Sequence, residues 1–190
     1  MEKQAKKAIV LLADGFEDVE AVTPIDYLKR AGIEVTSASI SGNLTVTSRW
    51  GVIKLITDTT LMDVQKSGIE SWDAVILPGG IPGATNLAAS EETNRFIKEM
   101  AAAGKLVCAI CASPVVILAP LGLLDGKKFT CYPGMEDKIP QGKWQDTDVV
   151  VDGNILTSRA AGTSGQFAVA IIEKLLDEAA AKKIAEAVLL

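Results

Sequence analysis

The stretch Lys105-Leu-Val-Cys-Ala-Ile-Cys-Ala-Ser-Pro-Val-Val-Ile-Leu-Ala119 decides how this sequence of 190 residues folds. Residues 106–111 form an unbroken apolar run, which is typical of a strand buried on both faces of a parallel sheet. Ala112, Ser113 and Pro114 follow at once, and the apolar residues 115–119 predict a short helix. Cys111 therefore lies where a strand turns sharply into a helix, which pushes its side chain out of the sheet.

This position makes Cys111 a candidate nucleophile. A thiol beside the free N–H groups of a helix start is expected to be partly ionised. The sequence contains no histidine, so no cysteine–histidine pair exists within the chain. Its partner in any proton transfer must then be a carboxylate, the helix dipole or a residue of another chain. The alternative is an inert core cysteine, and the strand–helix turn favours the functional interpretation.

The other two cysteines have structural interpretations. Cys108 and Cys111 have the Cys-x-x-Cys spacing of a thioredoxin-like redox pair. Residues three apart in a strand point to opposite faces, so we expect Cys108 to be a small buried hydrophobe. Cys131 is the only further thiol, and a structural zinc site needs four ligands, so no metal site is expected. An odd number of cysteines without a secretory signal argues against a disulfide framework.

Strands and helices are expected to alternate along one domain, 1–190. A first helix is predicted to begin at Thr23 and Pro24, or alternatively at an earlier residue. In either case it runs to Arg30, and Gly32 ends it. A small antiparallel excursion is predicted at 43–47 and 52–56. The order implies a mostly parallel sheet with helices on both faces. Strands are predicted at 8–13, 33–39, 74–77, 105–111, 129–131, 149–151 and 155–157, and further helices at 91–103, 163–176 and 179–189.

Composition limits the partners of this chain. Its net charge of −5 argues against nucleic acid or an anionic membrane surface. The uncharged residues 106–124 are long enough to span a bilayer, but Ser113, Pro114, Pro120 and Gly122 divide them into a strand and a helix. The charged N-terminal residues 1–7 precede an apolar run, 8–13, that is too short for a signal peptide, so we expect a cytoplasmic protein.

Three segments follow predicted strands and are expected to meet at one edge of the sheet: 14–20, 78–83 and 111–114. Glu17, Asp18 and Glu20 are either solvated charges at a helix start or include one buried carboxyl that keeps its proton beside the thiol. The N–H groups after Pro78 are candidates for an oxyanion hole with the amide of Ala112.

Two arginines have open roles. Arg49 and Arg159 are either surface charges, which their residue type alone favours, or ligands for an anionic group of a substrate.

Four motifs of this sequence occur in a familiar order: LLADGFEDVEAV (11–22), VILPGG (75–80), AICASP (109–114) and LTSR (156–159) with GTS (162–164). Together they resemble the ThiJ/PfpI superfamily (class I glutamine amidotransferase-like), most closely the branch of the Parkinson-disease protein DJ-one and its bacterial relatives. The resemblance covers nearly the whole chain in order. It implies a flavodoxin-like three-layer sandwich, a homodimer, and a reactive cysteine at a nucleophile elbow, here Cys111, that oxidises readily to a sulfinic acid.

The same resemblance implies roles for other residues. Glu20 matches the carboxyl that contacts the cysteine, and Gly80 and Ala112 match the suppliers of backbone N–H groups. Arg49 matches a position near the dimer interface and close to the partner's site, and Tyr132 stands where the animal branch carries a histidine. Glu17 and Gly79 are expected beside these groups.

The resemblance implies a cysteine-dependent enzyme without cofactors. Activities reported for the superfamily include a glutathione-independent glyoxalase and a disputed protein deglycase, so we expect it to act on small dicarbonyls such as methylglyoxal, or on their protein adducts. The alternative is an oxidative-stress sensor or chaperone acting through the sulfinic acid of Cys111. A relative without chemistry is a further alternative. A protease is disfavoured because Ala112 replaces the histidine of the protease-like branch. Cys131 is a candidate to resolve oxidised Cys111.

Overall fold

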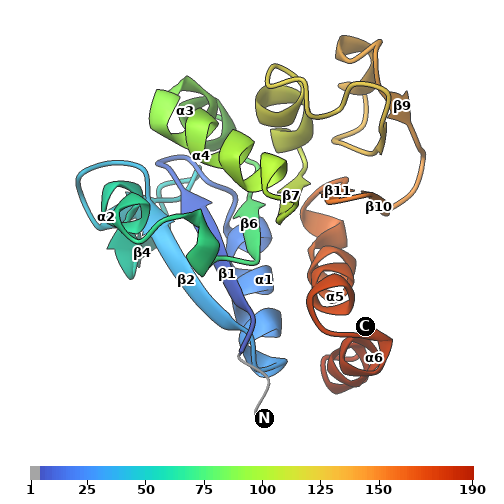
Figure 1. The fold of residues 1–190 in the computed structure, drawn as a ribbon, viewed down its shortest axis with the longest axis horizontal. Coiled ribbons are helices and arrows are strands. Elements are labelled where there is room, and N and C mark those ends of the chain that lie inside the picture. The colour runs from blue at the N-terminus through green and yellow to red at the C-terminus, as the bar shows by residue number, and fades with distance from the viewer. Residues whose placement is uncertain (1–4) are drawn as a thin grey trace.

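A seven-stranded sheet forms the centre of the structure, in the order β10-β11-β7-β6-β1-β2-β5 (Figure 1). The computed structural model describes residues 5–190, so Met1–Gln4 of the charged N-terminal segment lie outside the described part. All neighbouring strands are parallel except β10, which pairs antiparallel with β11. The strands are β1 (Lys7–Leu12), β2 (Glu34–Ser39), β5 (Thr59–Thr60), β6 (Ala74–Leu77), β7 (Leu106–Ile110), β10 (Val149–Asp152) and β11 (Ile155–Ser158).

Helices cover both faces of this sheet, which confirms the predicted three layers (Figure 1). On one face α1 (Asp18–Arg30) packs against α5 (Ser164–Leu175), and α6 (Glu178–Ala187) packs against α5. The other face carries α2 (Leu61–Lys66), α3 (Gly83–Ala89), α4 (Glu91–Ala102) and a π-helix, Pro114–Leu118. Short 3₁₀ segments lie at Ile69–Ser71, Glu136–Lys138 and Ala161–Thr163.

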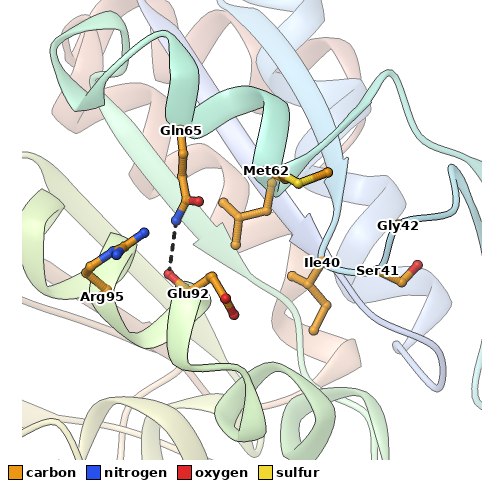
Figure 2. A pocket seen from close by; sticks show the side chains of 8 residues that line it. Ile40, Ser41, Gly42, Met62, Gln65, Glu92 and Arg95 are labelled. Atoms are coloured by element: carbon orange, nitrogen blue, oxygen red, sulfur yellow. Dashed lines mark hydrogen bonds between the residues drawn. The ribbon is translucent and has the colours of Figure 1, made fainter.

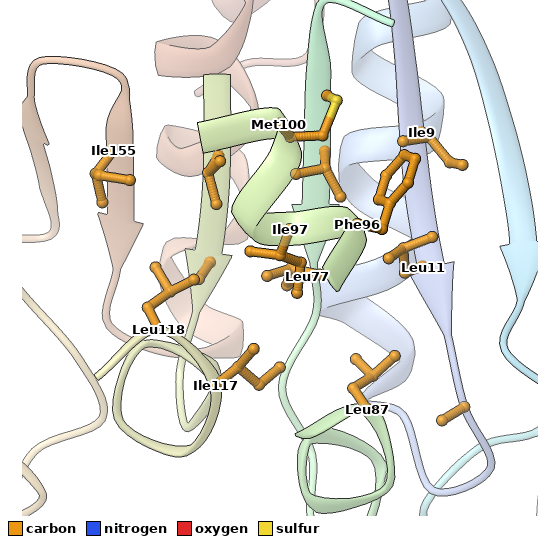
Figure 3. Close-up of a cluster of buried hydrophobic side chains, with 14 of the residues drawn as sticks. Ile9, Leu11, Leu77, Leu87, Phe96, Ile97, Met100, Ile117, Leu118 and Ile155 are labelled. Carbon is orange, nitrogen blue, oxygen red and sulfur yellow. The ribbon is translucent and has the colours of Figure 1, made fainter. Parts of the chain in front are cut away.

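The two faces of the sheet bury separate hydrophobic clusters. Along β1, Ile9 and Leu11 contact the cluster under α4, while Val10 and Leu12 contact the cluster under α1 and α5. This alternation follows from the period of two in a strand. Figure 3 shows the cluster under α4, where Phe96 and its neighbours on the helix meet side chains of β1 and β6. Complete burial on both faces explains why the strands read as unbroken apolar runs.

Two small sheets lie outside the central one. β3 (Thr45–Thr47) pairs antiparallel with β4 (Lys54–Ile56), which confirms the predicted excursion. β8 (Lys128–Phe129) pairs in parallel with β9 (Lys143–Trp144), a strand that the sequence did not indicate. The strand expected at 129–131 is shorter and begins earlier, at Lys128. Beyond Phe129, the N–H of Thr130 donates to Thr157 Oγ1 of β11, and the N–H of Tyr132 donates to the carbonyl of Cys111.

Several helix predictions need correction. The first helix begins at Asp18, so the earlier of the two starts is right, and Pro24 lies inside it. The short helices α2 and α3 were not predicted, although Thr60 caps α2 by accepting the N–H of Asp63. The uncharged residues 106–124 divide into β7, a turn and the π-helix. In the part of the chain that the structure describes, no helix has both the length and the apolar character to cross a membrane.

Candidate active site

Three loops interlock at the carboxyl edge of the central strands. They follow β1, β6 and β7, and they are the three segments that the sequence predicted to converge. The N–H of Glu17 donates to the carbonyl of Gly79 at 3.1 Å, and the N–H of Gly83 donates to the carbonyl of Gly15 at 3.1 Å. These backbone bonds fix the loop after β1 against the loop after β6. The site is therefore built on rigid elements at the sheet's edge.

Cys111 occupies a strained backbone conformation directly after β7. Its φ angle is 64°, in the left-handed region that residues with a Cβ rarely adopt. Its N–H donates to the carbonyl of Ser158 at 3.0 Å, and its carbonyl accepts the N–H of Tyr132 at 2.8 Å. Such strain costs roughly 1–3 kcal/mol and gathers at functional sites. The expected elbow is therefore present, and it turns the thiol away from the strand.

Ser113 holds the elbow in place, a role that the sequence alone did not reveal. Its fully buried hydroxyl donates to the carbonyl of Pro78 at 2.7 Å, which ties the end of β7 to the end of β6. The helix that follows is a π-helix rather than an α-helix, and the N–H of Ala119 donates to the carbonyl of Pro114 five residues back. π-Helical turns are often found at functional sites. A lone hydroxyl within an uncharged apolar stretch was the available signal for Ser113.

Glu20 is the carboxyl that faces the thiol. Its side chain is 1% exposed, accepts the N–H of Gly79 at 2.8 Å and lies within hydrogen-bonding reach of Cys111. Burial is the main cause that raises the pKa of Glu20 from 4.5 to about 7, and the nearby charge of Glu17 contributes to that rise. The hydrogen bonds from Cys111 and Gly79 and the charge of Arg49 act in the opposite direction. Glu20 therefore exchanges its proton near neutral pH.

The bare backbone of Gly79 lets these two side chains meet. A Cβ at Gly79 would lie 2.6 Å from Glu20 Oε2 and 2.7 Å from Cys111 Cβ, so no larger residue fits there. Gly80 has a φ of 86°, and its N–H, like that of Ala112, is directed at the Cys111 sulfur. The structure thus brings Gly79, Gly80 and Ala112 to the thiol.

The thiol itself is harder to ionise than its position at the turn suggested. Burial is the main cause that raises the pKa of Cys111 to about 12, and the charge of Glu20 and the hydrogen bond between the two side chains contribute to that rise. The N–H groups of Ala112 and Gly80 lower it, but not enough to compensate. The expectation of a partly ionised thiol is wrong beside an ionised Glu20. Once Glu20 carries the proton, its charge no longer opposes a thiolate and its O–H becomes a donor.

Charged and aromatic side chains form the rim of the site. Glu17 accepts from Arg49 Nη1 at 3.1 Å, and the Arg49 guanidinium lies over the ring of Trp50, 4.4 Å from its centroid. Arg49 therefore contacts the site of its own chain. Tyr132 adjoins Cys111 through its backbone, with its side chain half-exposed. Arg159 forms a partly buried ion pair with Asp146 at 2.9 Å, so it is not a free surface charge.

The remaining cysteines lie in the core. Cys108 is fully buried and free, which confirms the structural interpretation. It nevertheless packs on the same cluster as Cys111, because the left-handed turn at Cys111 breaks the alternation of the strand. Cys131 is buried in the cluster of the opposite face of the sheet. Within residues 5–190, no three histidine, cysteine or acidic side chains gather closely enough to hold a metal ion.

The sequence matches a protein-family model over most of its length. The model described as the DJ-1/PfpI family matches residues 6–174. The chain belongs to this family. Its fold is flavodoxin-like, as in the solved structure of oxidised Toxoplasma gondii DJ-1, which is 37% identical, superposes with a TM-score of 0.92, and is matched over 97% of this chain and 98% of that one.

Curated relatives of this family member differ in length. The Parkinson disease protein 7 homolog of Danio rerio is 39% identical over 94% of each chain. The glutathione-independent glyoxalase DJR-1.2 of Caenorhabditis elegans is 32% identical over 90% of this chain and 89% of that protein. Protein DJ-1 homolog B of Arabidopsis thaliana is 43% identical over 87% of this chain, which spans only 37% of that longer protein.

The raised pKa of Glu20 predicts how stability depends on pH. The folded protein holds this proton up to about pH 7, whereas the unfolded chain releases it near pH 4.5. The stability that Glu20 contributes is therefore complete below pH 4.5 and is lost as the pH rises to about 7, a change on the order of 3 kcal/mol. Urea unfolding across this range should show the decrease in the wild type and not in Glu20→Gln. The exposed control Glu173→Gln should behave as the wild type, and equal slopes in all three proteins would contradict the assignment.

Proposed function

We propose that this protein is a cysteine-dependent, cofactor-free enzyme that converts small dicarbonyls such as methylglyoxal into 2-hydroxy acids, or releases such adducts from proteins. One observation carries the proposal: the buried Glu20 carboxyl, with a pKa of about 7, contacts the Cys111 thiol beside two converging N–H groups. A nucleophile, a proton carrier and an anion site are thus within reach of one substrate. The name of the nematode relative DJR-1.2, a glutathione-independent glyoxalase, supports the same chemistry.

The first step is addition of sulfur to the aldehyde. Glu20 accepts the thiol proton, and the Cys111 sulfur forms a bond to the aldehyde carbon of methylglyoxal, giving a hemithioacetal. The former carbonyl oxygen takes the same proton from Glu20 and becomes a hydroxyl, which leaves Glu20 ionised for the next step. The N–H groups of Gly80 and Ala112 stabilise the negative charge that develops on that oxygen.

The second step moves hydrogen between the two carbons. Glu20 removes the proton from the carbon bonded to sulfur and passes it to the ketone oxygen, which forms an enediol. Glu20 then takes the proton of the hydroxyl on the sulfur-bearing carbon and delivers it to the neighbouring carbon. The carbon on sulfur is oxidised to a thioester while its neighbour is reduced to an alcohol, so no outside oxidant or reductant is needed. Water then cleaves the thioester, which frees lactate and restores Cys111. A carboxyl that titrates near neutral pH suits both proton transfers.

The direct test is conversion of methylglyoxal to lactate without added glutathione. Cys111→Ser should abolish turnover. Glu20→Gln should lower kcat by at least roughly a hundredfold, because general acid–base catalysis contributes about 10²–10⁴. Cys108→Ala, which removes a buried thiol outside the site, serves as the matched control and should retain activity if it folds.

Two outcomes would contradict this proposal. If the wild type shows no turnover of methylglyoxal above background, the protein does not have the proposed activity. Loss of turnover in Cys111→Ser together with an unchanged rate in Glu20→Gln would remove Glu20 from the proton transfers. Circular dichroism of each variant distinguishes loss of chemistry from loss of fold.

The second candidate function is an oxidative-stress sensor, or a chaperone controlled by the same chemistry. Cys111 is partly buried, and its sulfur faces the N–H groups of Gly80 and Ala112. Oxidation by a peroxide to the sulfinic acid places two oxygens and a negative charge there. These N–H groups and a protonated Glu20 would donate to the new oxygens. The Toxoplasma gondii relative has been solved in an oxidised form, which supports this candidate.

Peroxide titration followed by intact mass tests the sensor. We expect the wild type to gain the mass of two oxygen atoms at low peroxide, with peptide mapping placing them on Cys111. Glu20→Ala should oxidise less selectively, because it removes a hydrogen-bond donor to the sulfinate. An unoxidised Cys111 under conditions that already oxidise exposed Met62 would contradict the idea.

We also propose that two copies associate through the face beside the site, and that residues 1–190 act as one cytoplasmic domain. Val19 and Val22 project from α1, and Trp50 and Val52 from the β3–β4 loop, all at least 45% exposed. Arg49 lies on the same loop as Trp50 and contacts Glu17, so the face continues into the rim of the site. Apolar groups gathered on one surface are typical of an interface.

Sedimentation velocity tests the association. The wild type should sediment as a dimer, and Val22→Glu should sediment as a monomer, because it places a charge within the apolar face. Leu189→Glu carries the same charge at a 94% exposed position on the C-terminal segment and should remain a dimer. A monomeric wild type would overturn the proposal.

A further inference from the structure

A second pocket lies apart from Cys111, between the loop after β2, helix α2 and the first turns of α4 (Figure 2). Its volume is about 460 Å³, within the range of pockets that hold small molecules. It shares no lining residue with the thiol site. It too lies at the carboxyl edge of the sheet, beyond the ends of β2 and β5.

The two walls of this pocket differ in chemistry. Ile40, Leu61 and Met62 form an apolar wall, and Met62 is 63% exposed although it is a large hydrophobic side chain. Gln65 and the α4 residues Glu92 and Arg95 form the opposite wall, which Figure 2 shows facing Met62 and Ile40. One side of an occupant would therefore meet apolar carbon, and the other side would meet an anion and a cation.

Among residues 5–190, the two charges on the polar wall keep hydrogen-bonding capacity that the protein does not use. Glu92 and Arg95 are three residues apart on α4, a spacing that allows an ion pair, but they do not pair with each other. Arg95 forms an exposed ion pair with Glu99 one turn further along α4, but the distance of 4.0 Å from Nε to Oε1 is too long for a hydrogen bond and leaves the guanidinium N–H groups available. Within residues 5–190, the Glu92 carboxylate receives only a 3.5 Å contact from the Ser90 hydroxyl.

The amide beside these charges is also weakly held. Gln65 Nε2 donates to the backbone carbonyl of Glu92 at 3.5 Å, the long limit of a hydrogen bond (Figure 2). Its amide can therefore turn toward an occupant with little loss. On this wall, the Glu92 carboxylate can accept hydrogen bonds from an ammonium group, and the neighbouring Arg95 guanidinium can donate two parallel hydrogen bonds to a carboxylate.

We propose that this pocket binds a small zwitterion with an apolar body, of the kind represented by leucine. Glu92 accepts from the ammonium group, Arg95 donates to the carboxylate, and the aliphatic side chain lies on Ile40, Leu61 and Met62. Charge-assisted hydrogen bonds at both ends require both charges on the ligand. The site is independent of the chemistry proposed for Cys111.

Three probes that share one carbon skeleton test the requirement for both charges. Titration calorimetry of the full chain uses L-leucine, isoamylamine, which lacks the carboxylate, and 4-methylpentanoate, which lacks the ammonium group. Leucine should bind saturably, and each analogue should bind at least about tenfold more weakly, because it loses one charge-assisted interaction. An analogue that binds as tightly as leucine would overturn the zwitterion assignment, and no saturable leucine binding would overturn the site.

Matched variants on one helix locate the binding. Glu92→Gln and Arg95→Gln should each weaken leucine binding by at least about tenfold. Glu91→Gln and Lys98→Gln remove the same charges from positions of α4 that do not line this pocket, and they should bind as the wild type does. Equal losses in the control pair would show a general charge effect and overturn the assignment. Cys111→Ser should leave leucine binding unchanged, which separates this site from the proposed enzyme.

Discussion

The contact between Glu20 and Cys111 across the backbone of Gly79 is the constraint on which the site depends. Gly79 has no Cβ, so the carboxyl and the thiol share a space that any other residue would fill. The left-handed turn at Cys111 brings the sulfur into that space, and bonds to Ser158 and Tyr132 hold the turn. Ser158 lies at the end of the neighbouring strand β11, and Tyr132 lies in the segment after β8, so two separate parts of the chain stabilise one strained residue.

Burial takes the place of a histidine in this chain. Histidine titrates near neutral pH without help, whereas a carboxyl does so only when desolvation penalises its charged form. Glu20 is almost completely enclosed, and its pKa of about 7 follows mainly from that enclosure. The same enclosure raises the pKa of the thiol, so the two groups share one proton rather than ionising independently. A nucleophilic sulfur then depends on Glu20 holding the proton.

Much of the fold and part of the site could be predicted from the sequence. Unbroken apolar runs located β1, β6 and β7, because strands buried on both faces leave this pattern, and the order of the runs placed Glu20, Gly79 and Cys111 at one edge. The short helix α3 was missed because it carries too few residues to show a period, and the π-helix because its bonding has no sequence pattern. The pKa of Cys111 was missed because it depends on enclosure by residues distant in sequence.

The two functions proposed for Cys111 draw on the same groups and therefore compete. The N–H groups of Gly80 and Ala112 that would hold a substrate oxyanion are also placed to hold a sulfinate oxygen. A negative sulfinate beside Glu20 would keep that carboxyl protonated to a higher pH, just as the charge of Glu17 already does. Oxidation would therefore convert the nucleophilic sulfur of Cys111 into a sulfinate and, at the same time, keep Glu20 protonated so that it cannot act as a base. On this argument, an enzyme built around this pair is switched off by peroxide through its own catalytic geometry.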